Sequence, residues 1–264
     1  YASLSPLVSL AWSSLFAMVF FSCCVTVRKK WHELADRAAI KDALMVTFIL
    51  GVVFYAFFYS GLQYTTPGNA SLIALTEVFF TYLFFNIWRR DSLAPRHAVG
   101  ALFMVIGAAI ALSPNIMRFN PGDFLILCAM AVAPIGNFFA RRARQRISGE
   151  MIFFIRTLVA TPCIFAIAWI FGERFSIQQV QVAFWYLVMV GVVLLGVQKL
   201  LWIEAIHRIS VTKAISLSSF TPLVTLLFAW LLLSQAPTIT QLSSFIPLVV
   251  GTYLLTVVTG GDKS

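Results

Sequence analysis

Apolar residues dominate this chain in long runs, and short polar segments separate the runs. A helix rises 1.5 Å per residue and the hydrocarbon core of a bilayer is about 30 Å thick, so a run of about 20 residues predicts a membrane-spanning helix. The pattern therefore predicts an all-α integral membrane protein with nine spans. These cover residues 7–27, 42–62, 69–88, 98–113, 122–140, 151–171, 183–203, 211–233 and 243–259.

Composition supports this class. Hydrophobic residues make up 60% of the 264 residues and charged residues only 11%, which is more apolar surface than a soluble domain of this size could bury. The four cysteines lie inside predicted spans, without the spacing of metal ligands or of a disulfide framework. The sequence also has no phosphate-binding glycine loop and no nucleophile–base pair, so we expect neither an enzyme nor a bound cofactor or metal.

Lysine and arginine are distributed unequally between the two sides of the predicted membrane. The loops on one side hold only Arg118 and Arg174, whereas those on the other side hold Arg28, Lys29, Lys30, Arg37, Lys41, Arg89, Arg90, Arg96, Arg141, Arg142, Arg144, Arg146, Arg208, Lys213 and Lys263. The positive-inside rule places the basic loops and the C-terminus in the cytoplasm, and the N-terminus outside. The net charge of +9 therefore indicates a multi-pass protein of the cell (inner) membrane rather than a nucleic-acid partner.

An internal repeat relates the two halves of the chain. The first four spans match the last four in hydropathy, and the fifth is left over. The identities at a spacing of 145 or 144 residues are Ser71 with Ser216, Leu72 with Leu217, Thr76 with Thr221 and Gly107 with Gly251. We expect a five-helix repeat over 1–114 and another over 115–264, with the first helix of the first copy missing upstream. Because five is odd, the two copies would be inverted in the membrane.

Two segments carry a resemblance to a known family. The run GLQYTTPGNASLIALTEVFF, followed by a basic loop and GALFMVIGAAIALSPN, resembles the EamA-type, ten-helix branch of the drug/metabolite transporter superfamily, as does APIGNFFARRARQRIS followed by EMIFFIRTLVATP. The resemblance implies two inverted five-helix repeats around a central cavity, and export of small metabolites, often amino acids. The chain departs from the family pattern at Glu77, where many relatives have a proline, whereas the second repeat keeps Pro222.

Glu77 is the first candidate for a functional role. It lies near the middle of the third span, where an ionised carboxylate costs about 2.5–3.5 kcal/mol, so it needs a partner or a hydrated cavity. On a helical period it shares a face with Ala70, Ala74 and Thr81. We expect Glu77 to bind a substrate ammonium group or a coupling proton.

Two basic residues also lie inside spans. Arg156 and Lys199 lie at similar depths from the cytoplasmic side, and we expect them to bind a substrate carboxylate or to counter the charge of Glu77. The alternatives are a structural ion pair and side chains that extend to the interface. Asn137, at a similar depth, is predicted to border the same polar cavity or to form a helix–helix hydrogen bond. Glu204 is predicted to pair with Arg208 four residues later.

Four more residues complete the candidate site: Tyr55, Tyr59, Trp202 and Ser218. Aromatic side chains near span ends also serve as membrane anchors, and hydroxyls in spans also bond to their own helix. Together the candidates indicate a secondary transporter of a small-molecule metabolite that works by alternating access within the bilayer. An integral-membrane enzyme acting on a lipid-like substrate and a non-transporting scaffold are the alternatives. Nothing in the sequence indicates an oligomeric state.

Overall fold

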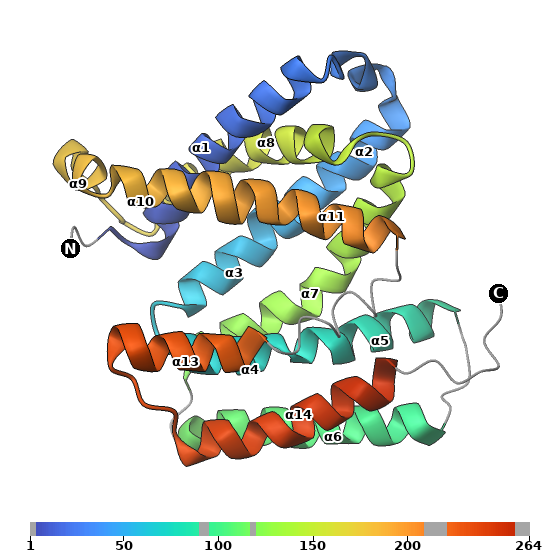
Figure 1. The fold of residues 1–264 in the computed structure, drawn as a ribbon, viewed down its shortest axis with the longest axis vertical. Coiled ribbons are helices and arrows are strands. Elements are labelled where there is room, and N and C mark those ends of the chain that lie inside the picture. The colour runs from blue at the N-terminus through green and yellow to red at the C-terminus, as the bar shows by residue number, and fades with distance from the viewer. Residues whose placement is uncertain (1–3, 90–94, 117–119, 209–220, 257–264) are drawn as a thin grey trace. The chain divides into compact units, whose positions relative to one another are not determined.

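The computed structural model describes residues 4–89, 95–116, 120–208 and 221–256, and every regular element in these ranges is helical (Figure 1). The predicted all-α class is confirmed. The elements in chain order are α1 (Pro6–Val27), η1 (Trp31–Ala35), α2 (Arg37–Val46), η2 (Thr47–Val53), α3 (Phe54–Gly61), α4 (Pro67–Ala74), α5 (Thr76–Arg89), α6 (Pro95–Ile116), α7 (Pro121–Arg144), α8 (Gly149–Ile170), α9 (Ile177–Val182), α10 (Phe184–Met189), η3 (Val190–Val197), α11 (Gln198–Arg208), α13 (Thr221–Leu233) and α14 (Ile239–Thr256).

Each predicted span corresponds to an apolar helical segment. Within the described ranges, six segments are long and apolar enough to cross a membrane, and three apolar helices are shorter. The six are Pro6–Val27, Arg37–Gly61, Pro67–Phe85, Pro121–Arg144, Gly149–Ile170 and Phe184–Arg208, and the shorter ones are Val99–Ile110, Val224–Leu233 and Ile239–Leu255. The first ten residues of the predicted span 211–233 lie outside the described residues.

The third span is interrupted, although the sequence predicted one continuous helix over 69–88. α4 ends at Ala74 and α5 begins at Thr76. Around the break the backbone forms the tighter i−3 hydrogen bonds, from Leu75 to Leu72 and from Val78 to Leu75, each 3.1 Å long. The hydroxyl of Thr76 donates to the carbonyl of Ile73. Such bonds shorten the local helical turn and place Glu77 in the first turn of α5.

The chain forms two compact units, and both combine segments from its two halves. The first unit contains 1–60 and 135–209, and the second contains 61–134 and 210–264. The chain changes unit three times, after Ser60, after Pro134 within α7, and after Ile209. These units are not the predicted repeats 1–114 and 115–264, because a repeat relates segments by sequence and not by contact. The two-repeat organisation stays a prediction.

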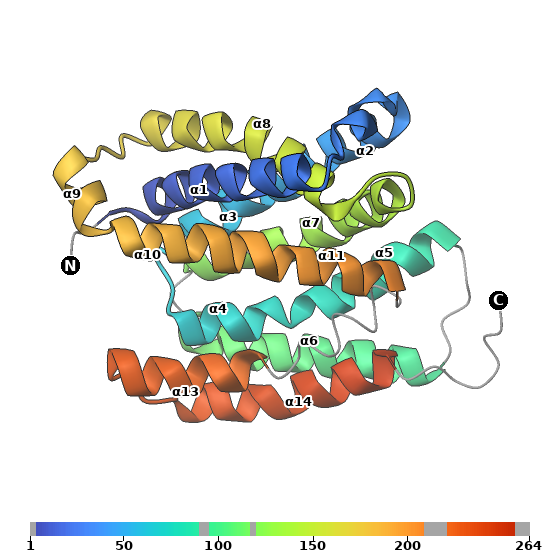
Figure 2. The same ribbon diagram turned by 45° about the horizontal axis from the view of Figure 1, so that its top comes forward.

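In the first unit, α1 and α8 lie side by side (Figures 1 and 2), η2 packs on α8, and η3 packs on α1. Glycines permit the close approach of η2 to α8 and of η3 to α1. A Cβ atom on Gly51 of η2 would lie 3.0 Å from the Cβ of Ala160 in α8, and one on Gly191 of η3 would lie 2.4 Å from the carbonyl oxygen of Ser13 in α1. Small residues therefore bring these four segments together, as is usual for helices in membranes.

In the second unit, α14 packs against α6, and α4 contacts α13. Gly100 and Gly251 meet where α6 and α14 cross, and a Cβ on Gly251 would lie 2.8 Å from the carbonyl oxygen of Gly100. The amide of Gln241 donates to Asn69 at 2.8 Å and so ties the start of α14 to α4. The hydroxyl of Thr65 donates to the buried carboxylate of Asp123.

The segments η2 and η3 are both π-helical, with hydrogen bonds that span five residues instead of four. They occur in the second and seventh predicted spans, which the repeat prediction pairs with each other. Gly51 and Gly196 in these segments stand 145 residues apart, the spacing of the identities found in the sequence. Each interrupts a longer apolar segment, α2–α3 in one case and α10–α11 in the other.

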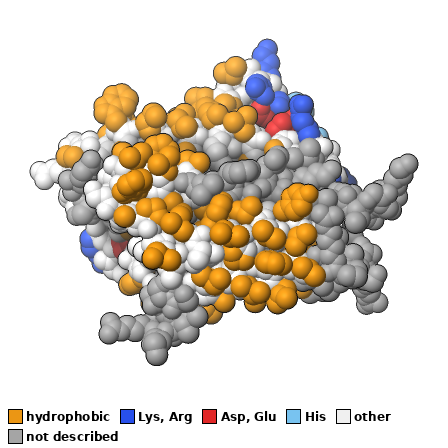
Figure 3. All heavy atoms as spheres, turned by 60° about the horizontal axis from the view of Figure 1, so that its bottom comes forward, with side chains coloured by type: hydrophobic (Ala, Val, Ile, Leu, Met, Phe, Trp, Pro, Cys, Tyr) orange, Lys and Arg blue, Asp and Glu red, His pale blue; other side chains and the backbone are white. Residues whose placement is uncertain are grey.

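Large hydrophobic side chains are exposed along most of the helices, as in a protein surrounded by lipid. Figure 3 shows such side chains spread over one face of the molecule, with charged side chains gathered at the edge of that view. The exposed side chains of α13 include Val224, Leu227, Phe228, Trp230 and Leu231. A soluble protein would not leave so continuous an apolar surface in water.

Ion pairs join the basic loops of the first unit to nearby carboxylates. The buried carboxylate of Glu150 contacts Arg28 and Lys30, and Asp42 binds the guanidinium of Arg142 through two hydrogen bonds. Glu150 also lies in the first turn of α8, where the helix dipole favours a negative charge. These contacts hold the loops against the ends of the helices.

We expect Glu150→Gln to lower the thermal stability of the purified protein. The substitution removes the negative charge between Arg28 and Lys30, and losing hydrogen bonds to charged groups costs about 1–3 kcal/mol. Thermal unfolding in detergent measures the effect. Glu204→Gln is the control, because Glu204 is more exposed and its loss costs at most about 1 kcal/mol. Equal melting temperatures for the two variants would contradict this prediction.

Candidate functional site

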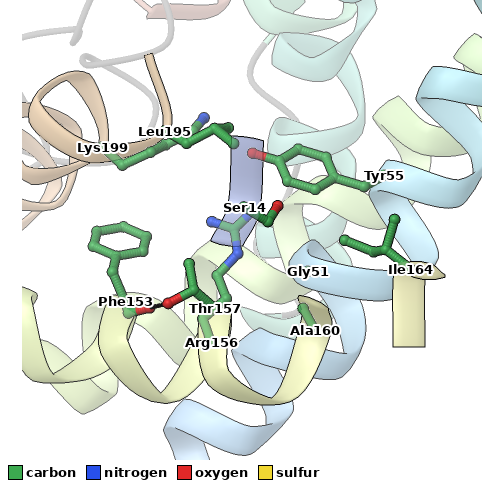
Figure 4. Close-up of a pocket in the computed structure, with 10 residues that line it drawn as sticks. All are labelled: Ser14, Gly51, Tyr55, Phe153, Arg156, Thr157, Ala160, Ile164, Leu195 and Lys199. Carbon is green, nitrogen blue, oxygen red and sulfur yellow. Dashed lines mark hydrogen bonds between the residues drawn. The ribbon is translucent and has the colours of Figure 1, made fainter. Parts of the chain in front are cut away.

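A small pocket with polar and apolar walls lies within the first unit, between α1, α8 and the two spans that contain the π-helical segments η2 and η3 (Figure 4). Its free volume is about 20 Å³, room for about one water molecule. A metabolite can enter only if side chains rotate or the helices move apart. The lining residues are Ser14, Gly51, Tyr55, Phe153, Arg156, Thr157, Ala160, Ile164, Leu195 and Lys199.

Arg156 is the most buried charge of the pocket, with 7% of its surface exposed. One N–H of its guanidinium donates to the carbonyl of Leu50 in η2 at 3.0 Å. The guanidinium carbon lies 4.8 Å from the ring centroid of Tyr55 and 5.6 Å from that of Phe153. Gly51 makes room for this side chain, since a Cβ there would lie 3.2 Å from Cγ of Arg156. The arginine is thus fixed by neutral groups and keeps its positive charge inside the unit.

Tyr55 and Lys199 occupy matching positions in the two interrupted spans. Each is the second residue after a π-helical segment, since η2 ends at Val53 and η3 ends at Val197. Figure 4 shows the ammonium of Lys199, the hydroxyl of Tyr55 and the guanidinium of Arg156 pointing towards one region. The pocket thus combines two cations with a phenol hydroxyl, and none of its lining residues is acidic.

The structure brings three of the predicted site residues together: Tyr55, Arg156 and Lys199. Tyr59 lies one turn further along α3, with its ring 5.6 Å from that of Tyr55. Trp202 is half-buried on α11, one turn after Lys199, and neither it nor Tyr59 lines the pocket.

The other predicted residues lie elsewhere. Asn137 is buried in α7 but does not line the pocket, so the predicted grouping of Asn137 with Arg156 and Lys199 does not describe this cavity. Glu77 is half-buried in α5 of the second unit. Ser218 lies outside the described residues. The predicted pair of Glu204 with Arg208 is confirmed at 2.8 Å, and Arg144 contacts the same carboxylate, also at 2.8 Å.

Sequence reasoning missed four small or polar lining residues: Ser14, Gly51, Thr157 and Ala160. Ser14 and its neighbour Ser13 lie near the middle of the first predicted span, and polar side chains within a span are candidates for a cavity. Thr157 follows Arg156 directly, and its hydroxyl donates to the carbonyl of Phe153 at 2.8 Å. Gly51 has no side chain that could indicate a binding site in the sequence. Only the packing of η2 against α8 shows that it lines the pocket.

Comparison with known proteins identifies the family. The model of the EamA-like transporter family matches residues 1–113 and 120–257. The chain belongs to the EamA-like transporter family. The predicted resemblance is therefore confirmed, and this EamA-like protein is a multi-pass membrane protein of a family of transporters.

Similar proteins agree with the family assignment of this EamA-like chain. It is 23% identical over 238 residues to an uncharacterized transporter of Synechocystis sp., covering 86% of this chain and 66% of the relative, so it spans just under two thirds of that protein. It is 18% identical over 221 residues to the uncharacterized transporter YoaV of Bacillus subtilis, covering 82% of this chain and 76% of YoaV.

A solved structure, described only as "Crystal structure of protein", shares the fold of this EamA-like chain. Its TM-score is 0.69 at 18% sequence identity. The match covers 96% of this chain and 88% of the other. At this identity the likeness concerns the fold alone.

Proposed function

We propose that this protein is a secondary transporter that exports amino acids or related small metabolites by alternating access. The observation that carries the proposal is the pocket of Tyr55, Arg156 and Lys199, where two cations are held among membrane-spanning helices. Ionisable groups inside a membrane domain are costly and mark substrate or ion pathways. In this proposal the pocket contacts the substrate, and the substrate crosses the membrane chemically unchanged.

The proposed arrangement is two inverted repeats, 1–114 and 115–264, in the cell (inner) membrane with the C-terminus in the cytoplasm. The paired π-helical segments and the matching positions of Tyr55 and Lys199 support the repeat. The basic loops support the orientation. Within this scheme Glu77 carries a coupling proton or binds a substrate ammonium, and Asn137, Tyr59, Trp202 and Ser218 contribute to the substrate pathway.

Flux measurements in sealed vesicles test this proposal. Purified full chain is reconstituted into proteoliposomes loaded with a mixture of labelled amino acids and organic acids, and efflux is followed with the released compounds identified by mass spectrometry. We expect efflux of at least one unchanged compound. Arg156→Gln should reduce that efflux roughly tenfold or more, because a hydrogen bond to a charged group is lost.

Arg37→Gln is the matched control, since Arg37 is exposed on α2 and does not line this pocket. It should transport as the unaltered protein does. Chemically altered products would favour the integral-membrane enzyme, and no compound-dependent flux at all would favour the scaffold. Either result would reject the transport proposal.

A further inference from the structure

We propose that the pocket of the first unit binds an organic anion through its carboxylate group. Of the substrates in the transport proposal, this keeps the related metabolites that are organic acids without an ammonium group, not the amino acids, and it leaves Glu77 only the coupling-proton role. This inference rests on the proposed transport function and narrows its substrate. The pocket presents two cations to any ligand, Arg156 and Lys199, and the first unit offers no negative charge to balance them.

All acidic residues of the first unit bind elsewhere. Asp36 contacts Arg146, Asp42 contacts Arg142, and Glu204 contacts Arg144 and Arg208. Glu150 contacts Arg28 and Lys30. The remaining two accept from serines, Glu33 from Ser148 and Glu173 from Ser5. These are the only six acids in the unit's sequence, and none lines the pocket.

Neutral groups alone cannot balance the two cations. Arg156 donates a hydrogen bond to the Leu50 carbonyl and contacts two aromatic rings, and these neutral groups attract its charge but do not cancel it. Lys199 has neither a hydrogen bond nor an ion pair within the described part of the chain. Arg156 is buried and Lys199 half-buried. Charges held away from water without a counter-charge in their own unit are unfavourable, and two of the same sign repel each other. An anion that enters the pocket removes both costs at once.

The shapes of the groups favour a carboxylate. A guanidinium presents its N–H donors in a planar fork that matches a carboxylate, and most of the donors of Arg156 stay available after the bond to Leu50. The hydroxyls of Tyr55 and Ser14 face the same region (Figure 4) and can donate to its oxygens. Phe153, Ile164 and Leu195 form an apolar wall for a short hydrocarbon portion. An ammonium group would meet two like charges here and no carboxylate.

Binding of matched small probes to the full chain tests the inference. The purified protein in detergent is titrated at constant ionic strength with butyrate, butyramide, butylammonium, 4-aminobutyrate and butyl phosphate, and the melting temperature is followed. Butyrate should raise it in a saturable manner, whereas butyramide and butylammonium should not. 4-Aminobutyrate should bind more weakly than butyrate, because its ammonium finds no acceptor.

Variants assign the binding to the pocket. Lys199→Gln should weaken butyrate binding roughly tenfold or more, whereas Lys41→Gln, at an exposed position of α2, should leave it unchanged. Arg156→Lys keeps the charge but loses the planar fork, and it should also weaken binding. The melting temperature without ligand shows whether each variant is folded, and the two substitutions are on different helices, so one remains informative if the other fails to fold.

Several results would overturn the inference. These are equal or tighter binding of 4-aminobutyrate or butylammonium, tighter binding of butyl phosphate, and butyrate binding that neither pocket substitution changes. Another is butyrate binding that appears only in Glu77→Gln, which would show that Glu77 already balances the two cations. Because binding is measured without flux, butyrate binding by a protein that transports none of the compounds would reject the transport proposal and keep only the carboxylate-binding pocket. Transport of zwitterions without butyrate binding would keep the transport proposal and reject the inference that the pocket binds organic acids.

Discussion

Gly191→Val should strongly destabilise the first unit. Gly191 lies in η3 where it touches α1, and a Cβ atom there would lie 2.4 Å from the carbonyl oxygen of Ser13 and 2.8 Å from Cβ of Phe16. Neither atom can move aside by a side-chain rotation, so α1 and η3 must separate. Overpacking a tight contact costs about 1–3 kcal/mol, and backbone contacts are the least adjustable. Thermal unfolding and size-exclusion chromatography in detergent measure the loss.

Val193→Ala is the control, because Val193 lies in the same segment with its side chain exposed. It should melt close to the unaltered protein. A Gly191→Val protein that is monodisperse and melts at the original temperature would show that η3 does not pack on α1 in the way described. Gly191 also lies one turn before Leu195, which lines the pocket. A folded variant that has lost transport would therefore indicate that Leu195 and Lys199 are displaced.

Glu77→Gln should abolish the response of transport to a pH gradient while leaving the protein folded. Glutamine resembles a protonated glutamate, so a proton-coupling residue fixed in this form can no longer exchange its proton. Glu77 lies half-buried in the first turn of α5, directly after the break at Leu75. Irregular backbone at membrane depth is typical of ion and substrate sites. Flux and melting temperature of the variant, both measured across pH, check this expectation.

Two other results would assign Glu77 a different role. A marked fall in melting temperature would mean that its carboxylate balances a buried base, because removing one partner leaves the other charge uncompensated. Unchanged flux with an unchanged pH profile would remove Glu77 from the mechanism. Glu204→Gln serves as the comparison, since its carboxylate lies between two partly exposed arginines and should affect neither measurement strongly.

The spans could be predicted from the sequence because they depend on length and hydropathy, which are local. The family could be predicted because its motifs extend over much of the chain. The break at Leu75 and the π-helical segments could not, because they follow from hydrogen bonds shifted by one residue, and nothing in the composition of TFILGVV or VGVVLLGV distinguishes a π helix from an α helix.

The site was most clearly predictable where a residue carries a charge, and Tyr55 is the one uncharged candidate among the described residues that lines the pocket. Arg156 and Lys199 are the two bases inside spans, and the cost of their burial identified them. Asn137 was grouped with them by depth along the membrane normal, but depth does not fix the direction in which a helix presents a side chain. Ser14 and Gly51 reach the pocket because α1, η2 and α8 cross there, which is a property of packing between distant parts of the chain.

The two π-helical segments limit how the pocket can change. A π turn moves along a helix only by whole residues, and at 3.6 residues per turn each such step rotates the residues that it passes by about 100°. Tyr55 and Lys199 each stand two residues beyond a π segment, so a shift of either segment past them turns that side chain from the pocket to another face of its helix. The direction of each side chain would therefore change in steps of about 100° and not gradually.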